Sequence, residues 1–387
     1  MNKGKIYIIL TGVHERKVFD LYNILKKHHT QYELLLFDYK DTSFSLPVVY
    51  TKKIYKLPND NYPHFETALF NPLNAYKGNT FIYIPLLDNY NGLFYQFIQT
   101  HPGLLSFLLP DIKSFNTTIN KIQFQLFCEN NQLPVPASFT KKDTPFLQQH
   151  FKPLIIKPNT GAGSVGISFI NNAAELSLLE SLDFENYLVQ ERIDNINVEG
   201  AFFLMHKGEL VSYYGHKRIR VFPETGGVTV YSEYQYQEPL KKIGAELLKK
   251  LNWDGIAMVE FLYDAATNDF KIIEVNPRLW GSFMLGEFAQ TGIIENYLNI
   301  CLQQPVKHFD HRTGTRIRWF YPFDILLYVK RKGKIKDFWK LDRSNTCYIN
   351  FTYAGFIRSL IYMTYFTFNI NSIKRFYKKL GTGNTSK

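Results

Sequence analysis

The feature that most constrains this chain is a glycine-rich loop between two predicted strands. The stretch Lys157–Gly166 contains the pattern G-x-G-x-x-G, whose glycines are Gly161, Gly163 and Gly166. A Rossmann turn needs a helix directly after such glycines, but Val165–Ile170 is typical of a strand. A P-loop is also excluded, because no Gly-Lys-Ser/Thr follows. The loop is therefore predicted to be a hairpin.

A glycine hairpin of this kind can close over nucleotide phosphates. Its backbone amides and the Ser164 hydroxyl can donate to phosphate oxygens, and Lys157 at the end of the first strand would supply a fixed positive charge. A tight turn alone would need only one or two glycines. Protein kinases also use a glycine hairpin, but this sequence lacks their catalytic-loop Asp with its downstream Asn, and it lacks Asp-Phe-Gly. A kinase is therefore excluded.

Two carboxylates and an amide are predicted to share one face of a second hairpin. Its strands are Ile256–Tyr263 and Phe270–Val275. Because strand side chains alternate, Glu274 and Asn276 point to one side, and Glu260 lies in the facing strand. A carboxylate inside an apolar strand is costly to bury unless it is paired or binds a cation. These oxygen ligands suit Mg²⁺, which also takes ligands from substrate phosphates.

Further polar residues lie near these two hairpins. Arg278 follows the second hairpin and could reach a transferring phosphoryl group or an oxyanion. The apolar strand Tyr187–Ile193 runs into Gln190 and Glu191, where backbone groups could bind adenine, and Glu199 could accept hydrogen bonds from ribose hydroxyls.

The rest of the chain before residue 306 alternates strand and helix signals. The N-terminal signals have the β-turn-α-β order that predicts a parallel sheet with crossover helices. An amphipathic helix is expected from Asn120-Lys121, with Ile122, Leu126 and Phe127 on one side. Asp88, just after a predicted strand, is either a ligand-binding residue or a solvated loop acid. The expected N-terminal strands are Lys5–Leu10, Tyr32–Asp38 and Phe81–Pro85, and the expected helices are Glu15–His28 and Pro239–Leu251.

Taken together, these motifs resemble the ATP-grasp superfamily. The resemblance covers roughly Ser114–Ile300 and rests on five ordered motifs: the Asn-Lys helix start, the glycine loop, Val-Gln-Glu, Val-Glu-Phe and Ile-Glu-Val-Asn-Pro-Arg. It implies α/β and α+β architecture. The expected units are a Rossmann-like pre-ATP-grasp domain (1–115), a two-subdomain ATP-grasp domain (116–305, with a lid at about 137–190) and a basic, aromatic-rich C-terminal extension (306–387).

The resemblance also implies roles for individual residues. Lys121 and Lys157 would hold ATP phosphates, and the glycine loop would be their lid. Arg278 would lie beside the reacting carboxylate, and Lys217 and Arg218 would touch substrate or γ-phosphate. The residues expected at the adenine and ribose are Gln190, Glu191, Ile193 and Glu199, and the expected ligands of Mg²⁺, with Mn²⁺ as a substitute, are Glu260, Glu274 and Asn276.

The segment Asn276–Ser282 is similar to the carboxylate–amine ligase branch, where carbamoyl phosphate synthetase-like members cluster. This similarity implies an ADP-forming enzyme that activates a small-molecule carboxylate as an acyl phosphate and transfers it to an amine. Two alternatives stay open: a thiol or hydroxyl acceptor, and a nucleotide-binding module without catalysis. The residues beyond Arg278 differ from those of biotin carboxylase, which argues against bicarbonate and biotin.

All of the excess positive charge lies in the last fifth of the chain. Residues 311–387 contain 16 Lys/Arg and three acids, whereas the other 310 residues contain 29 basic and 31 acidic groups. We expect this region to pack on the ATP-grasp core. The alternative is peripheral contact with an anionic membrane or a glycan precursor, and nucleic acid is the least favoured partner. Scattered cysteines and the lack of an 18-residue apolar run favour a cytoplasmic protein, peripheral at the inner membrane face if it docks there. A homo-oligomer stays open.

Overall fold

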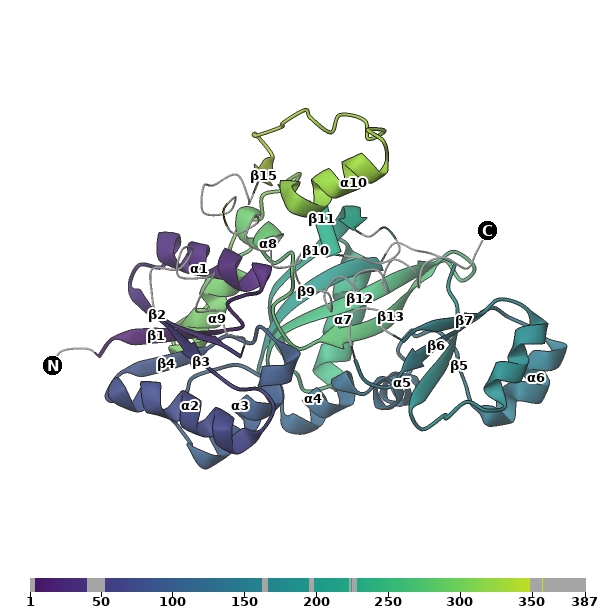
Figure 1. The fold of residues 1–387 in the computed structure, drawn as a ribbon, viewed down its shortest axis with the longest axis horizontal. Coiled ribbons are helices and arrows are strands. Elements are labelled where there is room, and N and C mark those ends of the chain that lie inside the picture. The colour runs from purple at the N-terminus through teal and green to yellow at the C-terminus, as the bar shows by residue number, and fades with distance from the viewer. Residues whose placement is uncertain are drawn as a thin grey trace.

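In the computed structural model, the described part of the chain comprises residues 4–39, 53–161, 166–194, 198–222, 224, 228–348 and 357. This part forms three β-sheets with helices around and between them (Figure 1). One sheet is parallel and two are mainly antiparallel, so the predicted α/β and α+β fold class is confirmed. Among the helices of these ranges, none is long and apolar enough to cross a bilayer.

The N-terminal sheet is parallel, with the strand order β3-β2-β1-β4. The predicted strand Tyr32–Asp38 is β2, and the other predicted N-terminal elements agree with the structure to within two residues. Strand β3 and helices α2 and α3 had not been predicted. The elements are β1 (Ile6–Thr11), α1 (Arg16–His28), β2 (Tyr32–Asp38), β3 (Ile54–Lys56), α2 (Tyr62–Ala75), β4 (Thr80–Tyr83) and α3 (Asp88–Thr100).

The two faces of this sheet contribute to different cores. Tyr7 and Ile9 of β1 pack with α2 and α3 on one face. Ile8 and Leu10 point to the other face, as strand alternation requires, and pack with α1, α8 (Met284–Phe288), α9 (Ile293–Cys301) and the central sheet. The N-terminal unit and the central sheet therefore share one hydrophobic core, so the side chains of α1 can reach the candidate site.

The central sheet has seven strands in the order β13-β12-β9-β10-β11-β14-β15. Neighbouring strands are antiparallel except for β14 and β15. Helix α7 (Glu238–Lys250), predicted as Pro239–Leu251, covers the face opposite the N-terminal unit. The strands are β9 (Val198–His206), β10 (Glu209–Phe222), β11 (Val228–Gln235), β12 (Gly255–Asp264), β13 (Asp269–Asn276), β14 (Arg316–Arg318) and β15 (Thr346–Tyr348).

A third sheet, in the order β5-β8-β6-β7, is antiparallel and has its own small core. It occupies the segment predicted as the lid subdomain and lies beside α5 (Figure 1). Strand β7 begins at Ser168, later than the predicted strand that starts at Val165, which is outside the described residues. The elements are β5 (Ser138–Phe139), η1 (Lys141–Asp143), α6 (Thr144–Gln149), β6 (Leu154–Pro158), β7 (Ser168–Ile170), η2 (Ala173–Leu179) and β8 (Tyr187–Glu191).

Helices α4 (Ile112–Ile119) and α5 (Lys121–Asn130) join the N-terminal unit to this third sheet. The predicted apolar face of α5 is wrong. The structure buries Phe124 and Cys128, which lie four residues apart on one face, whereas Leu126 is 51% exposed. The core contributed by Leu133 and α7 decides which face is buried, and this information is not present in the helix sequence itself.

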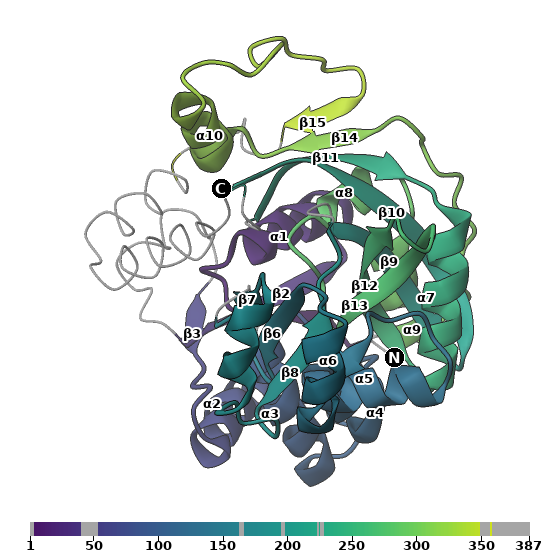
Figure 2. The same ribbon diagram turned by 90° about the vertical axis from the view of Figure 1, so that its right-hand side faces the viewer.

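The described part of the C-terminal region adds to the central sheet and then forms a projecting segment. Strand β14 pairs with β11, followed by a π-type turn η3 (Phe320–Asp324) and α10 (Ile325–Lys330). Figure 2 shows α10 and β15 at the edge of the sheet beyond β11. The first part of the predicted extension 306–387 therefore packs on the core, as expected. The later aromatic and basic stretches, after Tyr348, lie outside the described residues apart from Ile357.

Candidate active site

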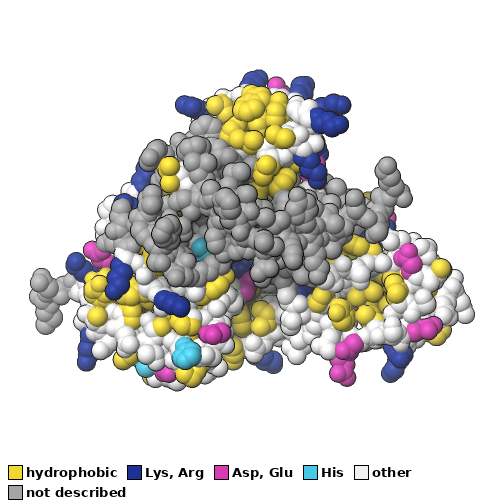
Figure 3. Space-filling view, in the orientation of Figure 1, with side chains coloured by type: hydrophobic (Ala, Val, Ile, Leu, Met, Phe, Trp, Pro, Cys, Tyr) yellow, Lys and Arg dark blue, Asp and Glu magenta, His cyan; other side chains and the backbone are white. Residues whose placement is uncertain are grey.

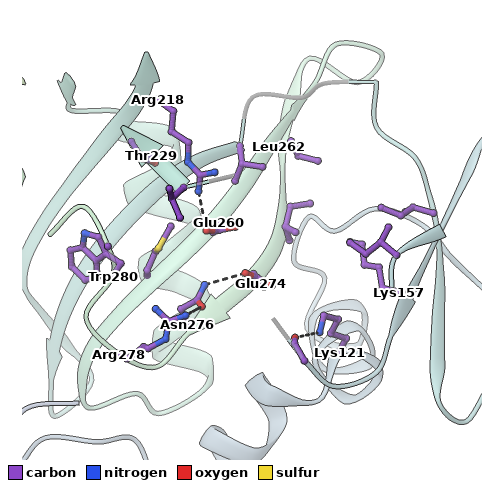
Figure 4. A pocket seen from close by; sticks show the side chains of 18 of the residues that line it. Lys121, Lys157, Arg218, Thr229, Glu260, Leu262, Glu274, Asn276, Arg278 and Trp280 are labelled. Atoms are coloured by element: carbon purple, nitrogen blue, oxygen red, sulfur yellow. Dashed lines mark hydrogen bonds and ion pairs between the residues drawn. The ribbon is translucent and has the colours of Figure 1, made fainter. Parts of the chain in front are cut away.

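A cavity of about 460 Å³ lies where the central sheet, the third sheet and α5 meet (Figure 4). Five cationic and two anionic side chains line it, so the cavity is suited to a polyanion. Four of them, Glu260, Glu274, Lys121 and Lys157, had been predicted as nucleotide or metal ligands. The charged lining residues are Arg16, Lys121, Lys157, Arg218, Glu260, Glu274 and Arg278.

Glu260 and Glu274 face each other directly across the β12–β13 pair, as the hairpin pattern predicted. Two carboxylates at opposed positions repel one another unless a cation lies between them. Burial, followed by the charge of Glu274, raises the pKa of Glu260 to about 7, although Arg218 and Arg278 act in the opposite direction. Arg218 donates from Nη2 to Glu260 Oε1 at 3.2 Å. This pair of acids therefore fits a divalent cation.

Asn276 and Arg278 continue the same face beyond the end of β13. Asn276 Nδ2 donates to Glu274 Oε1 at 3.2 Å, and Asn276 Oδ1 accepts from Arg278 Nη2 at 3.0 Å. An amide oxygen has two lone pairs, so Oδ1 keeps one that could bind a metal ion. The described residues contain no group of three or more His, Cys, Asp or Glu suited to a metal. The candidate set is therefore two carboxylates and one amide.

The glycine loop and α5 position Lys121 opposite the acidic pair. Asn120 caps α5, and its side chain accepts from the Gln123 amide at 2.9 Å. Asn159, just before the glycines, accepts from the amide of Lys121 through its carbonyl and from that of Ile122 through Oδ1. Lys121 Nζ then donates to the carbonyl of Gly161 at 2.8 Å. Burial lowers the pKa of Lys121, whereas Glu274 opposes this shift.

Lys157 projects from the end of β6 and is almost fully buried. Its Nζ donates to Gln190 Oε1 at 2.7 Å, and Gln190 in turn donates from Nε2 to Gln125 Oε1 at 2.6 Å. Burial lowers the pKa of Lys157 to about 8; Glu274 opposes the shift and Lys121 adds to it. The Gln190 side chain predicted to lie at the adenine hinge therefore lines the cavity as a partner of this lysine.

The glycine loop itself is described only at its ends. Gly161 has φ +109° and Gly166 has φ +77°, so a side chain at either position would be strained. At Gly166 a Cβ would also lie 2.8 Å from Pro158 Cγ. Gly161 lines the cavity and Gly166 does not, while Gly163 and Ser164 lie outside the described residues.

Besides Gly166, three described residues that were predicted to bind the nucleotide do not line the cavity: Glu191, Ile193 and Glu199. Glu191 accepts from the amide of Ala137 at 3.0 Å. Glu199 is paired in register with Phe261, next to the pair of Gly200 and Glu260, so it points to the α7 side of the sheet. There it accepts a hydrogen bond from the Gln237 side chain.

Strand alternation also separates Lys217 from Arg218. Arg218 and His216 line the cavity, whereas Lys217 lies between them on the exposed face of β10. The expectation that both basic residues touch substrate therefore has support only for Arg218. His216 is buried, and its Nδ1 lies 2.9 Å from the Ser282 hydroxyl. Burial and the neighbouring Arg218 hold the pKa of His216 well below its usual value, which keeps the ring neutral.

Sequence reasoning missed Arg16, which reaches the cavity from α1. Its guanidinium carbon lies 4.2 Å from the centroid of the Trp319 ring. Nη2 donates to the carbonyl of Gly281 at 3.2 Å, and Nη1 lies 3.5 Å from that of Thr229. The neighbouring Lys17 is buried and donates to the carbonyl of Leu279 at 3.2 Å. The only signal in the sequence is the position of this basic pair, just after the first strand.

Comparison with known proteins agrees with this fold. Residues 118–282 match the family model described as an ATP-grasp domain, which spans both hairpins and the acidic pair. This segment of the chain is therefore similar to ATP-grasp domains. A D-aspartate ligase of Enterococcus faecium is 23% identical over 231 residues, or 52% of this chain. The match spans 54% of that ligase, about half of its length.

Solved structures share the fold at low sequence identity. A biotin carboxylase of Campylobacter jejuni, solved as an ATP complex, superposes with a TM-score of 0.62 at 14% identity; the match covers 79% of this chain and 73% of that one. An L-amino acid ligase of Bacillus licheniformis gives a TM-score of 0.53 at 18% identity, over 78% of this chain and 74% of the ligase. The likeness in fold therefore extends beyond the matched residues 118–282.

Proposed function

We propose that this chain is an ATP-dependent carboxylate–amine ligase that forms ADP. The observation that carries the proposal is the opposed pair Glu260 and Glu274, which faces Lys121 and Lys157 across one cavity. Paired acids that require a cation, opposite one buried and one half-buried lysine, suit a nucleotide triphosphate with its metal ion. Arg218 and Arg278 on the same face suit a carboxylate substrate beside the terminal phosphate.

In the first step the cavity residues bring a carboxylate to the terminal phosphate of ATP. Lys121 and Lys157 bind phosphate oxygens, while Glu260, Glu274 and Asn276 would hold Mg²⁺ or Mn²⁺, which neutralises phosphate charge when bound. A carboxylate oxygen forms a bond to the γ-phosphorus, the bond from that phosphorus to the bridging oxygen breaks, and ADP leaves. Arg278 orients the carboxylate for this in-line attack.

In the second step an amine nitrogen attacks the acyl carbon of the acyl phosphate. The bond from carbon to the phosphate oxygen breaks, inorganic phosphate leaves, and the amine loses a proton to solvent. Arg278 can stabilise the negative charge that develops on the acyl oxygen. The names of the two ligase relatives favour amino acids as substrates, so D-aspartate and the L-amino acids form the first panel.

A screen of ADP release tests the proposal. Each amino acid is offered as the carboxylate with a second amine, and products are read by mass. We expect ADP release that requires both substrates and an amide product. Hydroxylamine in place of the amine should give a hydroxamate, because it intercepts an acyl phosphate.

The screen also separates the two alternatives. If a product forms only with thiols or alcohols, the acceptor is a thiol or a hydroxyl group and not an amine. The chain would be a nucleotide-binding module without catalysis if it binds ATP but releases ADP with no substrate pair. In that case Glu274→Ala should bind MgATP as tightly as the unchanged chain.

A further inference from the structure

An exposed apolar patch lies on the projecting C-terminal segment, remote from the cavity. Four large side chains around α10 and the loop after it are exposed. In Figure 3 apolar side chains gather over α10 at the top of the molecule, with Lys and Arg around them. The four residues, named here the α10 platform, are Leu326 (37% exposed), Val329 (65%), Trp339 (60%) and Leu341 (40%).

The platform is rigidly supported from below. The Trp339 ring packs edge-on against Phe320, Tyr328 and Phe338, with centroid distances of 5.7, 5.4 and 5.0 Å. Phe338 itself is buried and stacks on Tyr328 at 4.3 Å. Trp339 is therefore fixed at its base while most of its surface faces solvent, which is costly unless the surface has a partner.

A buried ion cluster ties this support to the central sheet. Asp324, which is fully buried, accepts from Arg220 of β10 at 2.7 and 2.8 Å, and from Arg318 of β14 at 2.6 Å. The guanidinium carbon of Arg318 lies 4.4 Å from the centroid of the Phe338 ring. Breaking a pair of this kind is costly. The ion cluster therefore attaches the exposed platform to the folded central sheet.

Positive charge surrounds the platform. Residues 326–341 contain six Lys/Arg and one acid, Asp337, and all six basic side chains are exposed. Arg331 pairs with Glu224. The other five basic residues are lysines, and none of them has a carboxylate of the described residues within 4 Å. These lysines are Lys330, Lys332, Lys334, Lys336 and Lys340. These lysines leave a net positive rim around an apolar centre.

We propose that the α10 platform docks on an anionic lipid bilayer. The aliphatic side chains of the platform can insert at the boundary between lipid head groups and acyl chains. Tryptophan is enriched at this membrane–water interface, and the surrounding lysines can bind anionic head groups. Nucleic acid would use the lysines, but its phosphate backbone offers nothing to Val329 and Leu326. The inference uses no residue of the cavity and does not depend on the proposed ligase activity.

Co-sedimentation of the full chain with vesicles tests the proposal. We expect binding to vesicles that contain phosphatidylglycerol, weak binding to pure phosphatidylcholine, and loss of binding as salt rises. The double change Lys334→Glu and Lys336→Glu should weaken binding more than about 10-fold, because each lysine contributes about fivefold. The double change Val329→Ser and Trp339→Ser should weaken it by at least about 10-fold, while the remaining binding stays salt-sensitive.

Matched changes on the third sheet provide the controls. Phe146 and Leu178 are 52% and 53% exposed, and Lys141 and Lys142 are also exposed. Phe146→Ser with Leu178→Ser, and Lys141→Glu with Lys142→Glu, should leave vesicle binding unchanged. All variants keep residues 349–387, so a difference between them is due to the platform. Circular dichroism melting confirms that each variant is folded.

Three results would overturn the proposal. The first is the absence of binding to phosphatidylglycerol vesicles, and the second is equal binding by the platform variants and the unchanged chain. The third is a different occupant. Binding to a single-stranded RNA oligonucleotide that needs the lysines but not Trp339 would assign the surface to nucleic acid, and a dimer in ultracentrifugation that Trp339→Ser dissociates would assign it to a second copy of this chain.

Discussion

Arg278 donates from Nε to Oδ2 of Asp88 at 2.7 Å, across 190 residues of sequence. The pair links the loop after β13 to the start of α3. Because the Arg278 Nη2 group also donates to Asn276, the guanidinium plane is held on both sides. Burial, followed by the charge of Arg278, lowers the pKa of Lys17 to about 7, while Asp88 opposes the shift. Asp88 of the N-terminal unit therefore orients Arg278 and balances its charge.

Asp88→Asn should impair use of the carboxylate substrate more than binding of ATP. The amide can still accept from Arg278, but it loses the charge that compensates for two cations. We expect kcat/KM for the carboxylate to fall about 10-fold, which corresponds to about 1.4 kcal/mol, with the Kd of MgATP unchanged. Steady-state kinetics and calorimetry measure the two effects. Asp60→Asn, an exposed acid of the same unit, is the control. An equal loss in ATP affinity would contradict this assignment.

Glu274→Ala should abolish substrate-dependent ADP release while the protein remains folded. Removing one of the two acids leaves Glu260 and Asn276 as the remaining candidate ligands, and we expect a loss on the order of 10²–10³ in kcat, as for one preorganised group. The increase in Tm on addition of MgATP should also disappear. Glu246→Ala on the exposed face of α7 is the matched control. Full activity in Glu274→Ala would contradict the assignment of Glu274 as a metal ligand.

ATP affinity should fall as pH rises from 7 to 9 because of Lys157. Its pKa in the free protein is lowered to about 8, so the protonated form that binds phosphate is depleted above that pH. Bound phosphate favours the charged lysine, so binding takes up a proton and weakens with increasing pH. Calorimetry at pH 7, 8 and 9 measures the trend. Lys157→Met should bind weakly at every pH, and Lys157→Arg should remove the dependence. If ATP affinity falls with pH to the same extent in both variants, the pH dependence is due to another titrating group.

The chemistry of the two hairpins could be predicted because it is local. Strand alternation placed Glu274 and Asn276 on one face, and the structure pairs Glu260 directly with Glu274. The same rule could have excluded Glu199 and Lys217 from the predicted site, but only after neighbouring strands had been aligned with one another. Glu199 shares a face with Phe261 rather than with Glu260, and that register is set by pairing across more than 60 residues.

Contacts between distant segments could not be predicted. Arg16 contacts the carbonyl of Gly281 from 265 residues away, and this contact requires α1 to pack on the shared core. Gln190 was expected at adenine from its place in an apolar strand, but Lys157 and Gln125 determine where its amide points. The buried face of α5 likewise depends on its neighbours. In each case tertiary packing decides between orientations that the local sequence leaves open.

Gly255→Ala should destabilise the fold more than Gly208→Ala, which tests how the central sheet meets the N-terminal unit. Both glycines have positive φ, +90° and +79°. A Cβ at Gly255 would lie 2.4 Å from the carbonyl oxygen of Leu108, whereas Gly208 has open space around it. We expect a cost of about 1 kcal/mol at Gly208 from strain alone, and of about 3 kcal/mol or more at Gly255, where strain and a backbone clash combine. Thermal melting measures both, and equal losses in Tm would contradict the close approach of β12 to Leu108.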